Sequence, residues 1–117
     1  MKHKVYISGK ISGKEQEAQI AFFAIERLLT SCGFEPVNPF KNGLTEDDTW
    51  ERHLAVDIIA LLECDAILQL PGWEDSRGAR LEYEIAKLKR IPIAVVGTDG
   101  IEFKDISIRE IYNDRIS

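Results

Sequence analysis

The sequence predicts one α/β domain over residues 1–117, a three-layer fold in which a parallel sheet carries helices on both faces. Short apolar runs that end at a turn signal, such as Val5 to Ser8 and Ala66 to Leu70, are typical of buried strands. Between such runs lie longer segments whose apolar residues recur every three or four positions, as in helices packed on one side. Strands and helices alternate along the chain, and this order favours a parallel sheet built with right-handed crossovers.

The first half of the chain is expected to supply two strands and one helix. Val5 to Ser8 forms the first strand, and the loop Gly9 to Gly13 is either a ligand-contacting loop or an ordinary turn. A helix over Lys14 to Cys32 ends at Gly33, and Phe34 to Val37 follows as the second strand. The buried face of this helix is expected to carry Ala18, Phe22, Ile25 and Leu29.

The second half repeats the pattern. A helix over Thr49 to Cys64 leads to the strand Ala66 to Leu70, which stops at a proline-glycine turn. A helix from about Gly78 to Leu88 then precedes a strand over Ile91 to Val96. The expected buried stripe of that helix is Leu81, Ile85 and Leu88.

Two regions are less regular. The connection Lys41 to Thr49 is long, polar and glycine-containing, so it is either a functional lid or a mobile loop. Beyond the last long strand we expect a short strand over Ile101 to Phe103 and a short helix over Asp105 to Tyr112. Asn113 then either frays with the chain end or contacts a neighbouring subunit.

The net charge and the lengths of the apolar runs exclude some classes of binding partner. A net charge of −5 argues against polymeric nucleic acid, whose phosphates require a basic surface. No apolar run is long enough for a signal peptide or a membrane span, so we expect a cytoplasmic protein without membrane contact. Cys32 and Cys64 are expected to be buried free thiols.

Candidate binding residues gather at the carboxyl ends of the predicted strands, where α/β sheets bind ligands. Three segments converge there: Tyr6 to Gly13, Asn38 to Phe40, and Trp73 to Glu82. Glycines allow a close approach of the backbone, and the amides at the start of a helix suit a phosphate or a sugar hydroxyl. The predicted binding residues are Tyr6, Ser8, Gly9, Asn38, Phe40, Trp73, Ser76 and Gly78.

Asp57 lies in an otherwise apolar part of its helix, where a carboxylate is costly unless it is hydrogen-bonded. It either braces a neighbouring loop, with His53 one turn earlier as its partner, or serves as a site carboxylate.

Glu82 also has two interpretations. It either belongs to a solvated helix face with pairs such as Arg80 and Glu84, or it faces the crevice. The sequence lacks a GxGxxG motif, a Walker-type lysine, a serine-nucleophile elbow and metal-ligand spacing, so neither a metal nor a cofactor is expected. Glu82 and Asp57 could then act as nucleophile and supporting acid or base at a glycosidic carbon.

Three stretches resemble the nucleoside 2-deoxyribosyltransferase superfamily, in particular its small bacterial and phage branch. They are the opening VYISGKISG, the segment DIIALLECD from Asp57 to Asp65, and SRGARLEYEIAKLKRIPI from Ser76 to Ile93. The second is similar to the family's helix aspartate followed by an aspartate before a strand. The third is similar to its small-residue loop, glutamate and following strand. The resemblance implies a flavodoxin-like or Rossmann-like sheet.

The resemblance also implies roles. Glu82 corresponds to the nucleophile that attacks the anomeric carbon of a 2-deoxynucleoside, and Asp57 to the aspartate of the same pocket. Ser76 and Gly78 correspond to the loop that holds the 5′ end of the sugar, as hydroxyl or phosphate. Tyr6 and Gly9 correspond to residues that line the pocket.

The activity implied is deoxyribosyl transfer between bases, or hydrolysis, through a covalent deoxyribosyl-Glu82 intermediate. The implied partners are a small-molecule nucleoside or nucleotide and further copies of the chain in a homo-oligomer. A non-catalytic nucleotide-binding module of the same fold remains the alternative.

Overall fold

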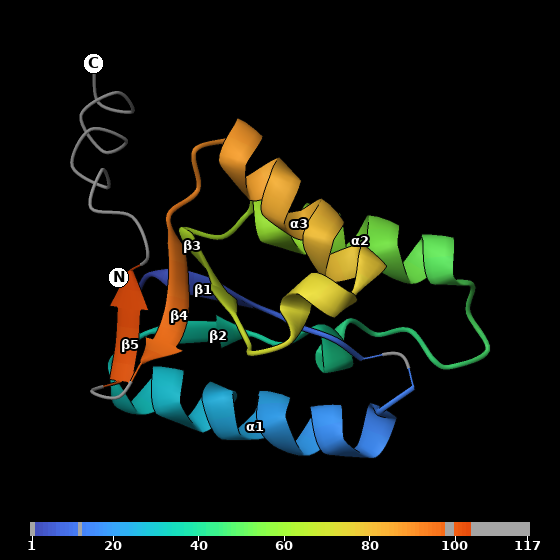
Figure 1. Ribbon diagram of the computed structural model, residues 1–117, viewed down its shortest axis with the longest axis horizontal. Coiled ribbons are helices and arrows are strands. Elements are labelled where there is room, and N and C mark those ends of the chain that lie inside the picture. The colour runs from blue at the N-terminus through green and yellow to red at the C-terminus, as the bar shows by residue number, and fades with distance from the viewer. Residues whose placement is uncertain (1, 12, 98–99, 104–117) are drawn as a thin grey trace.

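The computed structural model describes residues 2–11, 13–97 and 100–103 of the chain, and these form a five-stranded sheet in the order β2-β1-β3-β4-β5 (Figure 1). The first four strands are parallel, and β5 runs antiparallel beside β4. The α/β fold with a parallel sheet is therefore confirmed. The strands are β1 (Lys4–Ser8), β2 (Glu35–Val37), β3 (Ala66–Gln69), β4 (Ile93–Gly97) and β5 (Gly100–Phe103).

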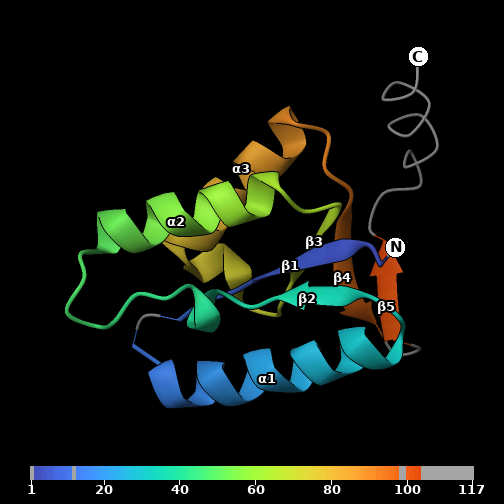
Figure 2. The same cartoon turned by 180° about the vertical axis from the view of Figure 1, so that it is seen from behind.

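Within the part of the chain that the structure describes, three α-helices cover the sheet, with α1 on one face and α2 and α3 side by side on the other (Figures 1 and 2). The chain forms β2 on one edge of β1 and then returns to form β3 along the other edge of β1. Such a reversal opens a crevice beyond the carboxyl ends of the two central strands. The helices are α1 (Glu15–Ser31), α2 (Trp50–Leu62) and α3 (Arg77–Leu88), and two short 3₁₀ turns, η1 (Pro39–Lys41) and η2 (Trp73–Asp75), lie on connections.

Strand β1 divides its side chains between two cores because neighbouring residues of a strand point to opposite faces. Val5 and Ile7 pack under α1, where Phe22 and Leu29 are fully buried. Tyr6 points to the opposite face and packs in the core beneath α2 and α3. The predicted buried face of α1 is confirmed, with Ile25 partly buried beside its three buried members.

The predicted buried stripe of α3 is wrong at Leu81 and Leu88, whereas Ile85 packs against the core. Leu81 and Leu88 are exposed on the outer surface, at 41% and 81% of their full area, and Ile85 is half-buried. The residues that face the interior are instead Ala79, Glu82 and Ala86. Two alanines allow the helix to approach the sheet closely, whereas leucines at those positions would hold it away.

Other boundaries differ slightly from expectation. Strand β4 begins at Ile93 instead of Ile91, and Pro92, which lacks an N–H, precedes it. Cys32, expected to be buried, is the C-cap residue of α1 and is exposed, whereas Cys64 is buried as expected. The predicted helix Asp105 to Tyr112 and Asn113 lie outside the described residues. Within the described ranges, no helix combines the length and hydropathy that crossing a bilayer demands.

Candidate functional site

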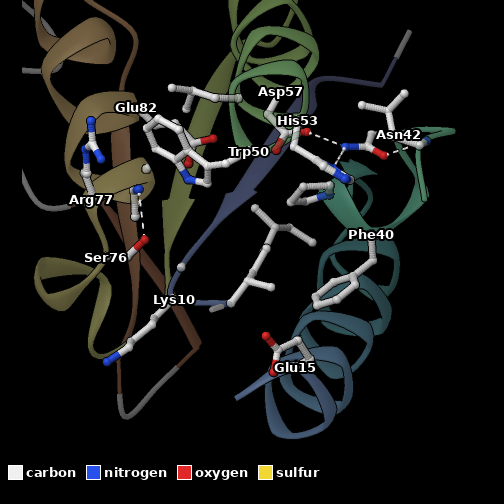
Figure 3. Close-up of a pocket in the computed structure, with 18 of the residues that line it drawn as sticks. Lys10, Glu15, Phe40, Asn42, Trp50, His53, Asp57, Ser76, Arg77 and Glu82 are labelled. Atoms are coloured by element: carbon white, nitrogen blue, oxygen red, sulfur yellow. Dashed lines mark hydrogen bonds between the residues drawn. The ribbon is translucent and has the colours of Figure 1, made fainter. Parts of the chain in front are cut away.

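A cavity of about 720 Å³ opens beyond the carboxyl end of β1, with walls from four parts of the chain (Figure 3). One wall is the end of β1 and the loop after it. The opposite walls are η1 with the 42–48 connection, one side of α2, and the first turns of α3. The cavity therefore lies at the reversal of strand order, where the sequence placed the candidate site.

Glu82 is buried in the wall formed by α3, with 6% of its surface exposed. The Tyr6 hydroxyl donates a hydrogen bond to its Oε2 across 2.6 Å, and the Ser8 hydroxyl donates to Oε1 across 2.7 Å. Tyr6 and Ser8 alternate along β1, so both point to the face that α3 covers. Each oxygen of the carboxyl group thus has a short hydroxyl partner, and the alternative of a solvated helix face is wrong.

Burial raises the pKa of Glu82 from 4.5 to about 7, because a desolvated carboxylate is costly. The hydrogen bonds from Tyr6 and Ser8 oppose this rise, and the negative charge of Asp57 adds to it. The pKa of Tyr6 lies well above its usual value, first because of its own burial and then because of Glu82. Near neutral pH, Tyr6 is therefore a fixed donor, while Glu82 is divided between its protonated and ionised forms.

Asp57 lines the cavity from α2, and it also accepts a hydrogen bond from the Asn42 side chain across 3.0 Å. Both interpretations of this residue thus describe part of its environment. His53 does not bond Asp57 directly. Its Nδ1 lies 3.2 Å from the Asn42 side-chain nitrogen, and its Nε2 lies 2.8 Å from the Thr45 carbonyl oxygen. Burial raises the pKa of Asp57 to about 6, against the opposing effects of Asn42 and His53.

The N-terminus of α3 contributes a third group of atoms. Ser76 is the N-cap, and its hydroxyl accepts a hydrogen bond from the Ala79 amide across 3.1 Å. The Arg77 guanidinium lies 4.5 Å from the ring centroid of Trp50, and both residues line the cavity. Backbone N–H groups and a cation at a helix start favour a negatively charged ligand group.

Gly9 is required by close packing. A Cβ atom there would lie 3.1 Å from the Leu70 Cβ and 3.3 Å from a ring carbon of Phe22. Phe40 packs edge-on against the same Phe22 ring, with centroids 5.2 Å apart, and also lines the cavity.

Most of the predicted site residues come together. Ser8 is not in the cavity wall but contacts Glu82. The predicted residues that do line the cavity are Tyr6, Gly9, Phe40, Asp57, Ser76, Gly78 and Glu82.

Asn38 and Trp73 do not line the cavity, and the prediction is corrected at both positions. Asn38 follows β2 as expected, but its side chain caps η1 and donates to Glu26 of α1 across 3.1 Å. Trp73 packs against Tyr83 on the outer side of α3, with ring centroids 4.7 Å apart. In both cases the backbone reaches the expected edge, but the side chain turns towards a neighbouring helix.

Asn42 and Lys10 line the cavity but were missed by sequence reasoning. The available signal for Asn42 was the pair Asn42-Gly43 after Pro39, which is typical of a sharp turn with a side-chain hydrogen bond. Gly43 has a φ of +84°, and the Asn42 side-chain oxygen accepts from the Leu44 amide. Lys10 carries no comparable pattern.

The cavity offers oxygen, amide and aromatic groups to a small polar ligand. Among the residues that the structure describes, no three His, Cys, Asp or Glu side chains are grouped so as to hold a metal ion. Two carboxyl groups, an indole ring and a helix N-terminus suit a ligand with a planar ring, hydroxyl groups and one anionic end.

Comparisons with known proteins agree with this architecture. A family model described as "Domain of unknown function (DUF4406)" matches residues 3–95. No curated protein matches the chain.

Several solved structures share the fold. A conserved protein from Enterococcus faecalis V583 has a TM-score of 0.64 at 20% identity and covers 85% of this chain. The chain spans 65% of the length of that protein. A 2-deoxyribosyltransferase from Bacillus psychrosaccharolyticus has a TM-score of 0.60 at 17% identity, covering 96% of this chain and 89% of its own. A CMP N-glycosidase from Clostridium botulinum has a TM-score of 0.55 at 18% identity, covering 94% and 81%. At these identities the similarity establishes the nucleoside 2-deoxyribosyltransferase-like fold.

Proposed function

The chain belongs to the DUF4406 family, and we propose that it is an N-glycosidic-bond enzyme acting on 2-deoxynucleosides or their 5′-monophosphates. One observation carries the proposal. Glu82 is a buried carboxyl group held by two hydroxyl donors in the wall of a cavity that a second raised-pKa carboxyl, Asp57, also lines. Perturbed carboxyl pairs of this kind are typical of sites where bonds are made and broken.

The proposed reaction begins with ionised Glu82. One of its oxygens attacks C1′ of the deoxyribose, the bond from C1′ to the base nitrogen breaks, and the base leaves with the electron pair. Asp57 or water supplies the proton that the departing base takes up. The glycosyl ester on Glu82 is then attacked by a second base, which completes transfer, or by water, which completes hydrolysis.

Protonation states limit this chemistry. Glu82 must be ionised when it attacks, although its pKa is about 7. Asp57, with a pKa of about 6, must be protonated if it is the acid. Because Glu82 has the higher pKa, the form needed for attack, with Glu82 ionised and Asp57 protonated, is the less populated of the two singly protonated forms. The two hydroxyl donors on Glu82 favour its ionised form at the moment of attack.

The first turn of α3 is the proposed place for the 5′ end of the sugar. Arg77 and the amides after Ser76 supply positive charge there, which favours a monophosphate over an uncharged nucleoside. The fold shared with a 2-deoxyribosyltransferase and a CMP N-glycosidase supports chemistry at an N-glycosidic bond.

A non-catalytic nucleotide-binding or sensing module is the second candidate. It is favoured by a pKa that leaves much of the Glu82 carboxyl group neutral at pH 7. A neutral carboxyl group is a poor nucleophile but a good hydrogen-bonding partner for a sugar hydroxyl.

We also propose a cytoplasmic homo-oligomer. The outer surfaces of α2 and α3 expose apolar side chains that a second copy could cover. They are Ile59, Leu62, Leu81 and Leu88. Light scattering of the purified chain would give its mass in solution, and a monomeric mass at working concentrations would contradict the oligomer.

The test of the proposed function is incubation with deoxynucleosides and their 5′-monophosphates, with and without a second free base, followed by chromatography. Base exchange identifies a transferase, and base release without exchange identifies a hydrolase. Glu82→Ala should reduce either activity by at least about a thousandfold. Glu84→Ala is the matched control, since Glu84 is an exposed carboxylate of the same helix. If no base is released while a deoxynucleotide raises the melting temperature, the binding module is the correct function.

A further inference from the structure

The Asn42 side chain makes three hydrogen bonds at one wall of the cavity (Figure 3). Its amide nitrogen donates to Asp57 Oδ1 across 3.0 Å and lies 3.2 Å from His53 Nδ1. Its oxygen accepts from the Leu44 amide across 2.9 Å. One side chain therefore joins α2 to the 42–48 connection and to a cavity carboxyl group.

The direction of each bond follows from the chemistry of the amide. The NH₂ group has two hydrogens and no acceptor, so His53 Nδ1 must accept the second hydrogen. The proton of the neutral imidazole then lies on Nε2, which donates to the Thr45 carbonyl oxygen across 2.8 Å. The network is thus consistent with one tautomer of neutral His53 and with an acceptor at Asp57 Oδ1.

We propose that Asn42 is a positioning residue for Asp57, holding Oδ1 and presenting Oδ2 to the ligand. In the protonated form of Asp57, Oδ1 acts as the carbonyl oxygen that accepts from Asn42, so the acid proton lies on Oδ2. The reactive role of Asp57 rests on the proposed function, but the hydrogen-bonded arrangement does not.

The other groups around Asp57 do not duplicate this role. His53, on the same helix, is neutral in this network, and any charge that it took up would lower the pKa of Asp57 less than Asn42 does. Glu82 on α3 and Tyr6 on β1 are coupled to Asp57 by charge. The remaining charged groups in the cavity wall are Lys10, Glu15, Glu46, Asp48, Asp75 and Arg77.

The test is a carboxyl ¹³C NMR titration of Asp57 in the full chain and in two variants. Asn42→Ala removes the donor, so the pKa of Asp57 should rise by roughly half to one pH unit. Asn42→Asp keeps an acceptor for the Leu44 amide but replaces the donor with a second negative charge, so the rise should be larger. Asp47→Ala is the control, because Asp47 is an exposed residue of the same connection that does not line the cavity.

The outcome does not depend on turnover. If both Asn42 variants titrate at Asp57 like the unmodified chain, the proposal is wrong and Asn42 only braces the loop. If the titration shifts in the expected order, the proposal stands even where no base is released, and only the proposed function fails. Where base release occurs, Asn42→Ala should lower kcat by about tenfold with a smaller change in KM.

Discussion

Tyr6 donates its hydroxyl to Glu82 Oε2 across 2.6 Å, although the two residues are 76 positions apart in the sequence. The bond joins β1 to α3, and residues of both elements line the cavity. Because both groups are buried, the pKa of the Tyr6 hydroxyl is raised well above its usual value, which favours the protonated hydroxyl as a donor. The Glu82 carboxyl group therefore accepts its hydrogen bond from a hydroxyl that is held in place by β1.

Tyr6→Phe should destabilise the ionised form of Glu82 relative to its protonated form, because the variant leaves Oε2 without its hydrogen-bond donor. We expect the pKa of Glu82 to rise further and the acidic limb of the kcat/KM profile to move to higher pH. Activity near pH 7 should fall by roughly 10- to 100-fold. Tyr83→Phe is the control, since Tyr83 packs on Trp73 at the outer side of the helix. An unchanged acidic limb in Tyr6→Phe would contradict the role of this bond.

Glu82→Gln should change the pH dependence of stability. The folded-state pKa of Glu82 is raised from 4.5 to about 7, so the native state keeps a proton that the unfolded chain has released between these values. The free energy of unfolding contributed by Glu82 is therefore greatest below about pH 4.5 and falls as pH rises through about 7.

The full difference corresponds to roughly 3 kcal/mol, and glutamine does not titrate. Relative to the unmodified chain, Glu82→Gln should thus gain stability between pH 5 and pH 8, as measured by urea unfolding. Glu84→Gln, at an exposed position, should show no such gain. A Glu82→Gln difference that is the same at both pH values would contradict the raised pKa.

Gly9→Ala should destabilise the fold by about 1–3 kcal/mol, because the new methyl group would press on the Leu70 Cβ and the Phe22 ring. Gly78→Ala is the matched comparison. Its Cβ would meet only a Leu54 methyl carbon at 3.9 Å, and alanine favours the helix. Thermal unfolding should place Gly9→Ala below the unmodified chain and Gly78→Ala at or above it. Equal losses in the two variants would show that close packing does not explain Gly9.

Arg77→Gln should remove preference for a 5′-monophosphate over the corresponding nucleoside. The guanidinium lines the cavity at the start of α3, where a phosphate would gain a charge-assisted bond. Calorimetry should show about a tenfold loss of monophosphate affinity and little change for the nucleoside. Lys41→Gln, which removes an exposed lysine paired with Glu26, controls for overall charge. Equal losses of affinity for the monophosphate and the nucleoside would mean that Arg77 does not bind the phosphate.

Periodicity in the sequence was enough to predict the sheet, the helices and the edge at which the cavity lies. The spacing of apolar residues predicts each strand and helix, and glycine and proline predict the turns between them. The order of the elements therefore followed from the sequence. Local spacing did not reveal which face of α3 is buried, since the leucine set and the alanine set have similar spacing. Packing against the sheet selects the set with small residues, and that information lies in β1 and β3 instead of in the helix.

Side-chain direction limited the prediction of the site. Asn38 and Trp73 occupy the expected strand-end segments, yet each finds a better partner on a neighbouring helix. Asn42 was missed because its three partners come from two segments that meet only after folding. Glu82 was a candidate because its helix starts at the predicted crevice, and the resemblance favoured that interpretation. Its burial could not be deduced from a helix rich in charged residues.

The alternation of β1 has a consequence for how this sequence can change over time. Odd-numbered positions from Val5 to Ile7 fill the core under α1, and the even-numbered Tyr6 and Ser8 hold the carboxyl group of Glu82. Deleting or inserting one residue within this strand would exchange the two sets, turning hydroxyl groups into the core and apolar groups towards the carboxyl group. A change of length within β1 would therefore disrupt the core under α1 and the hydroxyl contacts to Glu82 at the same time.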